Sequence, residues 1–257
     1  MTKYLKDIEL FVFDLDGTVY VGQNLIPGAL EIIDLLRRRA KVCFLTNNSS
    51  RSKAQYLQKL SGLGLDVTED ELLTSTDAAV MYLEQNCPGA GVYALATPDV
   101  LGELTARGIR LDDKNPDVVL LTYDTALTYQ KLADTAVFLK RGAKYVATHA
   151  DLTCPAEEAY LPDAGSFMAL IEAATGHRPD AVCGKPGPVL ARAIAQRYGV
   201  PAKNTAMFGD RQYTDILFAK QNGMRSVLVL TGESKLGEIT VQPDLVLGSI
   251  ADISKLI

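Results

Sequence analysis

The chain has 257 residues, of which 47% are hydrophobic and 22% are charged. This balance is ordinary for a globular protein and excludes a disordered or fibrous chain, and the length allows one large domain or two modest ones. A net charge of −5 argues against a non-specific nucleic-acid binder, which is normally basic.

Short apolar runs alternate with segments of helical periodicity along the whole chain. The apolar runs predict strands over residues 10–13, 42–46, 92–97, 118–123, 145–148, 205–208, 226–230 and 244–247, with another ending near Cys183. The periodic segments predict helices over residues 27–36, 52–60, 75–84, 98–107, 128–140, 188–198, 214–221 and 250–256, and a further helix starting at 165–166.

This alternation predicts an α/β protein in which helices cover both faces of parallel sheets. Ligands of such sheets bind where the carboxyl ends of the strands meet. The polar residues that follow the predicted strands are therefore the candidates for a functional site.

Two aspartates, Asp14 and Asp16, follow the first strand. In an extended chain, residues i and i+2 point to the same side, so these carboxylates would repel each other. A divalent cation would hold both and attract a phosphate. A solvated strand end, or an Asx-turn before Gly17, explains the pair equally well.

Two further strands also end in polar residues. Thr46, Asn47 and the residues after them offer donors to an oxyanion, although such residues also cap helices. Lys185 precedes a proline, which favours a strand–loop junction; alone it would be interpreted as a surface lysine.

A fourth strand end carries Asp210 and Asp215 after Gly209, whose missing side chain lets the backbone approach a ligand. Asp215 has the alternative role of balancing a helix dipole. In chain order, the four strand ends thus carry paired Asp, Thr and Asn, Lys, and a second Asp pair. Together these groups suit the binding of Mg²⁺ and a phosphoryl group, with a carboxylate nucleophile available.

The segment between Ser49 and Lys185 is far longer than the dozen or so residues that a crossover between parallel strands needs. We therefore expect an inserted domain. The predicted core comprises residues 1–79 and 181–257, and the predicted cap comprises residues 80–180. A cap over the site would exclude water and reach the leaving group.

The motifs at residues 14–18, 46–49, 184–186 and 209–215 resemble the four motifs of the haloacid dehalogenase (HAD) superfamily, and more narrowly those of its subfamily IIA, the NagD-like or p-nitrophenyl-phosphatase-like branch. Further matches at residues 146–148, 151–153, 161–166, 228–232 and 243–244 extend the resemblance over nearly the whole chain. It implies a Rossmann-like parallel-sheet core with an inserted α/β cap of type C2 (IIA). It also implies a Mg²⁺-dependent phosphatase, a phosphoric monoester hydrolase that acts on a small metabolite such as a sugar phosphate or nucleotide monophosphate.

The resemblance implies a role for each matching residue. Asp14 would attack phosphorus and become an aspartyl-phosphate. Asp16 would protonate the leaving alcohol and then deprotonate the attacking water. Thr46, the backbone of Asn47 and Lys185 would hold the phosphoryl oxygens.

The metal ligands implied by the resemblance are Asp14, the backbone carbonyl of Asp16, and Asp210, with Asp215 supporting the site. Tyr213 stands at a position that is often acidic in this branch, so we expect no third metal ligand there.

The predicted cap contains the tentative specificity residues His149, Asp151, Glu157 and Tyr160. His149 and Ala150 stand where many relatives have Asn-Pro, so this departure affects the inference about substrate more than the inference about catalysis. A structural loop explains the stretch equally well.

A phosphoacceptor signalling domain and a phosphotransferase use the same Asp chemistry and stay open as alternatives. No apolar run approaches the roughly 18–20 residues of a membrane span, and the N-terminus has no apolar stretch long enough for a secretory signal. We therefore expect a cytoplasmic protein whose partner is a small phosphorylated metabolite, with no nucleic-acid or membrane partner. Because caps of this family can pair, a homodimer is compatible with the resemblance.

Overall fold

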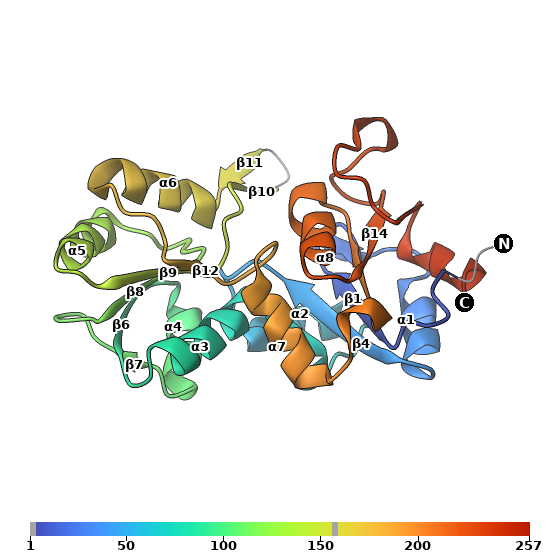
Figure 1. Cartoon of the computed structure of the whole chain (residues 1–257), viewed down its shortest axis with the longest axis horizontal. Helices are drawn as coiled ribbons and strands as arrows, with labels where there is room; N and C mark the ends of the chain where they lie inside the picture. The colour runs from blue at the N-terminus through green and yellow to red at the C-terminus, as the bar shows by residue number, and fades with distance from the viewer. Residues whose placement is uncertain (1–3, 156–158) are drawn as a thin grey trace. The chain divides into compact units, whose positions relative to one another are not determined.

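The computed structural model describes residues 4–155 and 159–257. They form two compact units. Unit 1 contains the described residues up to Thr46, together with Tyr56–Leu73 and Lys185–Ile257, and unit 2 contains Asn47–Gln55 and Thr74–Gly184. Each unit is built around its own sheet with flanking helices (Figure 1), which confirms the predicted α/β class.

The sheet of unit 1 has the strand order β15-β14-β13-β1-β4-β5. Its strands are β1 Leu10–Asp14, β4 Lys41–Thr46, β5 Leu72–Thr74, β13 Thr205–Gly209, β14 Arg225–Val229 and β15 Leu245–Leu247. The pairings of β1 with β4 and β13, and of β14 with β13 and β15, are parallel. All five residues of β1 are buried, as expected for a central strand covered on both faces.

Helices cover both faces of this sheet (Figure 1). The helical elements are α1 Ala29–Arg37, α2 Lys53–Gly62, α7 Pro188–Tyr198, α8 Leu217–Gln221, a π-helix Gln212–Ile216, and 3₁₀ helices Glu69–Glu71, Ala202–Asn204, Leu236–Glu238 and Ile250–Lys255. On one face, Phe11 and Phe13 pack in a common core with Ile33 of α1 and Ile253 of the last 3₁₀ helix. The rings of Phe13 and Phe208 stack with centroids 4.9 Å apart, which joins β1 to β13.

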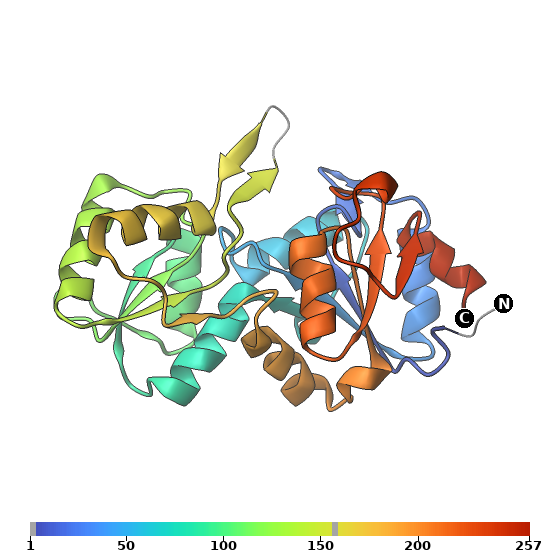
Figure 2. The same ribbon diagram turned by 45° about the horizontal axis from the view of Figure 1, so that its top comes forward.

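The sheet of unit 2 has the order β12-β9-β8-β6-β7, and its pairings are parallel. Its strands are β6 Gly91–Leu95, β7 Arg110–Leu111, β8 Val118–Leu121, β9 Lys144–Ala147 and β12 Ala181–Val182. Its helices are α3 Ser75–Asn86, α4 Pro98–Ala106, α5 Tyr129–Lys140 and α6 Ala164–Thr175. Helices α5 and α6 lie on one face and α3 and α4 on the other (Figures 1 and 2).

Two short antiparallel hairpins complete the described chain. In unit 1, β2 Tyr20–Val21 pairs with β3 Asn24–Leu25 directly after β1. In unit 2, β10 Thr153–Pro155 pairs with β11 Tyr160–Pro162. The strands of these two hairpins have two or three residues each and form no apolar run or periodic pattern, so the sequence does not predict them.

Two predicted helices differ from the observed ones. Residues 214–221, expected as a single helix, are divided between the π-helix Gln212–Ile216 and α8. The closing helix is the 3₁₀ helix Ile250–Lys255, started by a capping box in which Ser249 and Asp252 bind each other's backbone N–H groups.

The segment Asn47–Gln55, which the sequence analysis assigned to the core, belongs to unit 2. The reason is a set of hydrogen bonds around Ser49. Its hydroxyl lies 2.8 Å from the hydroxyl of Thr148 and accepts the N–H of Tyr123 at 2.8 Å. None of the helices formed by the described residues combines the length and apolar character needed to cross a membrane.

Candidate active site

Asp14, Thr46 and Asp210 lie at the carboxyl edge of the unit 1 sheet. Asp14 ends β1, Thr46 ends β4, and Asp210 directly follows β13. In the strand register, Asp14 pairs with Leu45 on one side, and the preceding Phe13 pairs with Phe208 on the other. Three of the four predicted strand ends therefore meet at one edge, as the topology of parallel sheets requires.

Lys185 joins two of the predicted site residues in the interior of unit 1. Its ammonium group donates a very short hydrogen bond to Asp14 and another, of 2.6 Å, to Asp215. Only 2% of Lys185 is exposed, and Asp215 is fully buried. Lys185 is therefore not a solvated surface residue, which is the default interpretation of a lysine considered by itself.

Burial and neighbouring charges both shift the pKa values of these groups. Burial raises the pKa of Asp14 well above its ordinary value, and the Lys185 charge opposes this only in part. Burial alone would lower the pKa of Lys185, but Asp14 and Asp215 outweigh it and hold that pKa above its usual range. Burial, followed by the Asp215 charge, raises the pKa of Asp210 to about 7.

The carboxylates of Asp14, Asp210 and Asp215 form a candidate metal centre. Each offers one oxygen, and these oxygens lie within 4.8 Å of one another. In Asp210, Oδ2 accepts the N–H of Glu233 at 2.7 Å, whereas Oδ1 is buried and has no hydrogen-bond partner among the residues that the structure describes. A cation would satisfy this otherwise costly oxygen, and carboxylate oxygens are the ligands that Mg²⁺ prefers.

Three glycines lie against two of these carboxylates, where a side chain would not fit. A Cβ at Gly17 or Gly232 would overlap the carboxylate of Asp210, and one at Gly209 would overlap that of Asp215. Gly17 also has a φ of 83°, in the left-handed region that favours glycine. The carboxylates of Asp210 and Asp215 thus lie close against glycine backbone, and the donor set of three carboxylates fits a small cation such as Mg²⁺.

Asp215 lies in the π-helix Gln212–Ile216 and is not in the first turn of an α-helix. Its Oδ2 accepts the N–H of Arg211 at 3.0 Å, while its Oδ1 binds Lys185. Helices of this rare type occur often at functional sites. The neighbouring Tyr213 is about half exposed and donates to Glu233 Oε2 at 3.1 Å.

Asp16 and Thr46 differ in exposure. Thr46 is buried at the end of β4. The carboxylate of Asp16 is about half exposed and accepts a hydrogen bond of 2.7 Å from the hydroxyl of Tyr20. The sequence does not indicate the contact between Tyr20 and Asp16, because an i, i+4 spacing predicts a contact only within a helix.

Asn47, the residue directly after Thr46, is held within unit 2. Its side-chain amide donates to Asp151 at 3.1 Å, and its backbone carbonyl accepts a very short hydrogen bond from the Ser75 hydroxyl. A Cβ at Gly184 would overlap Asn47 Oδ1, so the residue before Lys185 must be small. The backbone of Asn47 is therefore fixed by side-chain contacts on two elements.

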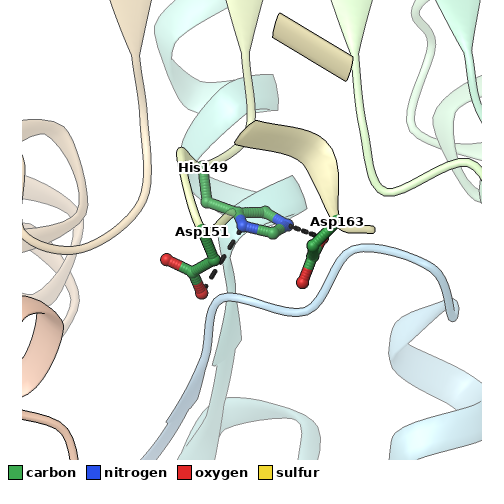
Figure 3. Close-up of side chains that lie close together, drawn as sticks. All are labelled: His149, Asp151 and Asp163. Atoms are coloured by element: carbon green, nitrogen blue, oxygen red, sulfur yellow. Dashed lines mark ion pairs between the residues drawn. The ribbon is translucent and has the colours of Figure 1, made fainter. Parts of the chain in front are cut away.

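His149 lies between two carboxylates in the interior of unit 2 (Figure 3). Its Nδ1 is 3.6 Å from Asp151 Oδ2 and its Nε2 is 3.6 Å from Asp163 Oδ1. Both separations exceed hydrogen-bond distance, and neither nitrogen has a hydrogen-bond partner within the described ranges. His149, Asp151 and Asp163 each offer one ligand atom, and these atoms lie within 4.8 Å of one another, so the three residues form a second group that could hold a metal ion. The imidazole also lies between the loop after β9 and Asp163, which caps α6.

The four predicted specificity residues have different surroundings. His149 and Asp151 are buried, whereas Tyr160 begins β11 and is 63% exposed. Glu157 lies outside the described residues. Asp163, which the sequence analysis did not single out, accepts the N–H of Ala164 at 2.6 Å; an aspartate before a helical segment was the available signal.

Comparisons with known proteins identify relatives over most of the chain. The family model of haloacid dehalogenase-like hydrolases matches residues 11–110, and a HAD-hydrolase-like model matches residues 182–253. An acid sugar phosphatase of Staphylococcus aureus is 32% identical over 237 residues, which are 91% of each chain.

Solved structures agree with these matches. The 4-nitrophenylphosphatase of Thermotoga maritima superposes with a TM-score of 0.95 at 39% identity and covers 98% of both chains. NagD of Escherichia coli K-12 superposes with a TM-score of 0.87 at 27% identity and covers 95% of this chain and 98% of its own.

Proposed function

The chain belongs to the haloacid dehalogenase-like hydrolases, in the subfamily IIA branch with NagD and the p-nitrophenylphosphatases, and from this premise we propose how its residues hydrolyse small phosphomonoesters. The protein is a phosphatase, a phosphoric monoester hydrolase. The observation that carries the mechanism is the buried ammonium group of Lys185 in contact with both Asp14 and Asp215.

In the first step, a carboxylate oxygen of Asp14 attacks phosphorus while the bond from phosphorus to the leaving oxygen breaks. Asp16 gives its proton to that oxygen, which leaves as the alcohol, and Asp14 becomes an aspartyl-phosphate. In the second step, water attacks phosphorus and gives a proton to Asp16, and the bond to Asp14 breaks. One acid/base thus serves both displacements and ends in its starting state.

Lys185 reduces the repulsion between the anionic nucleophile and the anionic phosphoester. Its charge is held in a buried position, where electrostatic stabilisation is stronger than in water. The hydroxyl of Thr46 and the backbone N–H of Asn47 are the proposed donors to the phosphoryl oxygens, together with Lys185. Thr46 ends β4, Asn47 directly follows it, and Lys185 follows β12.

Asp14, the backbone carbonyl of Asp16, and Asp210 are the proposed ligands of Mg²⁺, with Asp215 supporting the site. The buried Oδ1 of Asp210 and the glycines around its carboxylate support this assignment. The bound ion supplies positive charge that offsets the charge on the phosphoryl oxygens. Loss of activity with a chelator and its return with Mg²⁺ is the expected result, and full activity of the metal-free enzyme would contradict the assignment.

Unit 2 is the proposed cap, which selects the substrate. Tyr160 is the exposed member of the described candidates, and we propose that it contacts the leaving group. The buried His149 and Asp151 are assigned to holding the loop that follows β9. The acid sugar phosphatase among the relatives makes sugar phosphates the first substrates to test. Comparison of kcat/KM over sugar phosphates, nucleotide monophosphates and pyridoxal phosphate tests this choice.

The substitution Asp14→Asn tests the nucleophile. It keeps the shape of the side chain and removes the attacking oxyanion, so turnover of 4-nitrophenyl phosphate should be abolished while the melting curve stays cooperative. Retention of a tenth or more of the wild-type activity would exclude Asp14 as the nucleophile. A long-lived aspartyl-phosphate with little turnover in the presence of Mg²⁺ would instead favour a phosphoacceptor signalling domain.

A further inference from the structure

A buried tyrosine contacts the side chain of the proposed general acid. The hydroxyl of Tyr20 donates to Asp16 Oδ2 at 2.7 Å. Tyr20 is fully buried in the core of unit 1, whereas 54% of the Asp16 side chain is exposed. The hydrogen bond therefore connects a ring fixed by packing to a carboxylate that would otherwise rotate freely in solvent.

A tight turn brings these two residues together. The carbonyl of Leu15 accepts the N–H groups of Thr18, Val19 and Tyr20 at 2.9 to 3.2 Å. Gly17 adopts a positive φ, and its N–H donates to the carbonyl of Tyr20 at 2.8 Å. The position of the hydroxyl is thus determined by backbone hydrogen bonds as well as by the core.

Lys59 lies beside the same pair. Its ammonium group is 3.8 Å from the centroid of the Tyr20 ring and 4.0 Å from Asp16 Oδ1. The first contact is a cation–π interaction, which holds the ring further. The second is at the limit of an ion pair and involves a half-exposed carboxylate, so it contributes little to the orientation of Asp16.

We propose that Tyr20 is a positioning residue, which occupies Oδ2 of Asp16 and keeps Oδ1 for proton transfer. This inference rests on the proposed role of Asp16: the proton on Oδ1 passes to the leaving oxygen as the bond to phosphorus breaks. A carboxyl group held in one orientation transfers this proton more often than a rotating one, because the reacting atoms must be aligned. The competing explanation is structural, with Asp16 only satisfying a buried hydroxyl.

The choice of leaving group separates these explanations. Phenolate is a strong base and needs a proton as it leaves, whereas 4-nitrophenolate is a much weaker base and does not. For Tyr20→Phe we expect kcat/KM to fall about 10-fold to 100-fold with phenyl phosphate and to stay within about 3-fold with 4-nitrophenyl phosphate, since a positioned general acid contributes about 10²–10⁴. The parameter kcat/KM reports the first displacement, so the later attack of water does not obscure the comparison.

Three further variants complete the test. In Asp16→Asn, the loss of kcat/KM should depend on the leaving group more strongly than in Tyr20→Phe. Adding Tyr20→Phe to Asp16→Asn should change kcat/KM for phenyl phosphate by less than about 2-fold, because the two residues act as a unit. Tyr145→Phe removes another buried hydroxyl, which has no hydrogen-bond partner in the described part of the chain, and should leave both substrates unaffected.

The positioning role would be overturned if Tyr20→Phe lowered kcat/KM equally with both substrates or with neither. It would also be overturned if the losses of the two single variants multiplied in the double variant. These outcomes remain interpretable if Tyr20→Phe melts at a lower temperature, because the ratio between two substrates is independent of the amount of folded enzyme. If Asp16→Asn itself shows no dependence on the leaving group, the proposed acid role of Asp16 fails. If Asp16→Asn shows a dependence of kcat/KM on the leaving group and Tyr20→Phe does not, only the positioning role of Tyr20 fails, and the acid role of Asp16 stands.

Discussion

The ammonium group of Lys185 lies 2.6 Å from a carboxylate oxygen of Asp215, with both side chains in the interior of unit 1. Because Lys185 also contacts Asp14, its removal leaves two of the three clustered carboxylates without its positive charge. We expect Lys185→Met to lower kcat by about 10²–10³, the usual effect of losing one electrostatic group at a reacting centre.

The same variant should also be less stable, since a buried charge that loses its partner is costly. Mg²⁺ should therefore raise the melting temperature of Lys185→Met more than that of the wild type. An exposed lysine with no role in the site, Lys203, provides the matched control as Lys203→Met. Wild-type activity in Lys185→Met would contradict the electrostatic role.

Gly232 should be sensitive to the smallest possible substitution. An added Cβ would overlap the Asp210 carboxylate, so Gly232→Ala must displace a proposed metal ligand. We expect at least about a 10-fold loss of activity at limiting Mg²⁺, together with a weaker stabilisation of the folded protein by the ion. Gly237→Ala is the control, because a Cβ there meets nothing within 4 Å. Equal Mg²⁺ titration curves for the two variants would show that the site tolerates the displacement.

Asp77 should be a major contributor to the stability of unit 2. Its carboxylate accepts the N–H of Thr74 at 2.8 Å and lies 2.7 Å from Arg107 and 3.2 Å from Lys53. Asp77→Ala removes the capping box of α3 and leaves two partly buried cations, so the free energy of unfolding should fall by about 2–3 kcal/mol in urea denaturation. The exposed Asp99, as Asp99→Ala, should cost no more than about 0.5 kcal/mol. A similar loss in both variants would argue against the network.

Asp244 gives a prediction about pH. Burial opposes the charged form, but two hydrogen bonds of 2.8 Å from the backbone and hydroxyl of Ser226 hold the pKa of this carboxyl below its ordinary value. A depressed folded-state pKa means that the stabilisation is present above the unfolded pKa of about 3.9 and is lost as the pH falls through the lower, folded value.

The melting temperature of Asp244→Ala should therefore lie below that of the wild type at pH 7, and the difference should narrow below about pH 4. Ser226→Ala removes the hydroxyl, which donates to the Asp244 carboxylate and accepts the Asp244 backbone N–H, but keeps the backbone donor, so it should give a smaller difference with the same pH trend. A difference that stayed constant or widened on acidification would mean that the hydrogen bonds do not favour the carboxylate.

Much of the site could be predicted from the sequence, because parallel strands bring their carboxyl ends to one edge regardless of side-chain detail. That rule alone predicts that Asp14, Thr46 and Asp210 lie together, as they do at the carboxyl edge of the unit 1 sheet. It could not reveal that Lys185 lies between Asp14 and Asp215, since the contact depends on the π-helix that contains Asp215. Nor could spacing reveal the contact between Tyr20 and Asp16, which a non-helical turn creates.

The fold was predictable to a similar extent. Long apolar strands such as β1 and β8 have a clear pattern, but the two-residue strands β2 and β3 do not. The assignment of Asn47–Gln55 to unit 2 depends on hydrogen bonds between residues far apart in sequence, such as that between Ser49 and Thr148. No local pattern carries this information.

The membership of Asn47–Gln55 in unit 2 has a consequence for protein engineering. Consider a chimera in which only residues 80–180 are replaced by the same region of a relative. Asn47 and Ser49 would then come from this chain, whereas the residues that face them would come from the relative. The bonds to Asp151 and Thr148 would be lost unless the donor happened to supply matching residues. Exchange of unit 2 between relatives therefore requires two transplanted pieces, a long insertion and a nine-residue companion that precedes it in the chain.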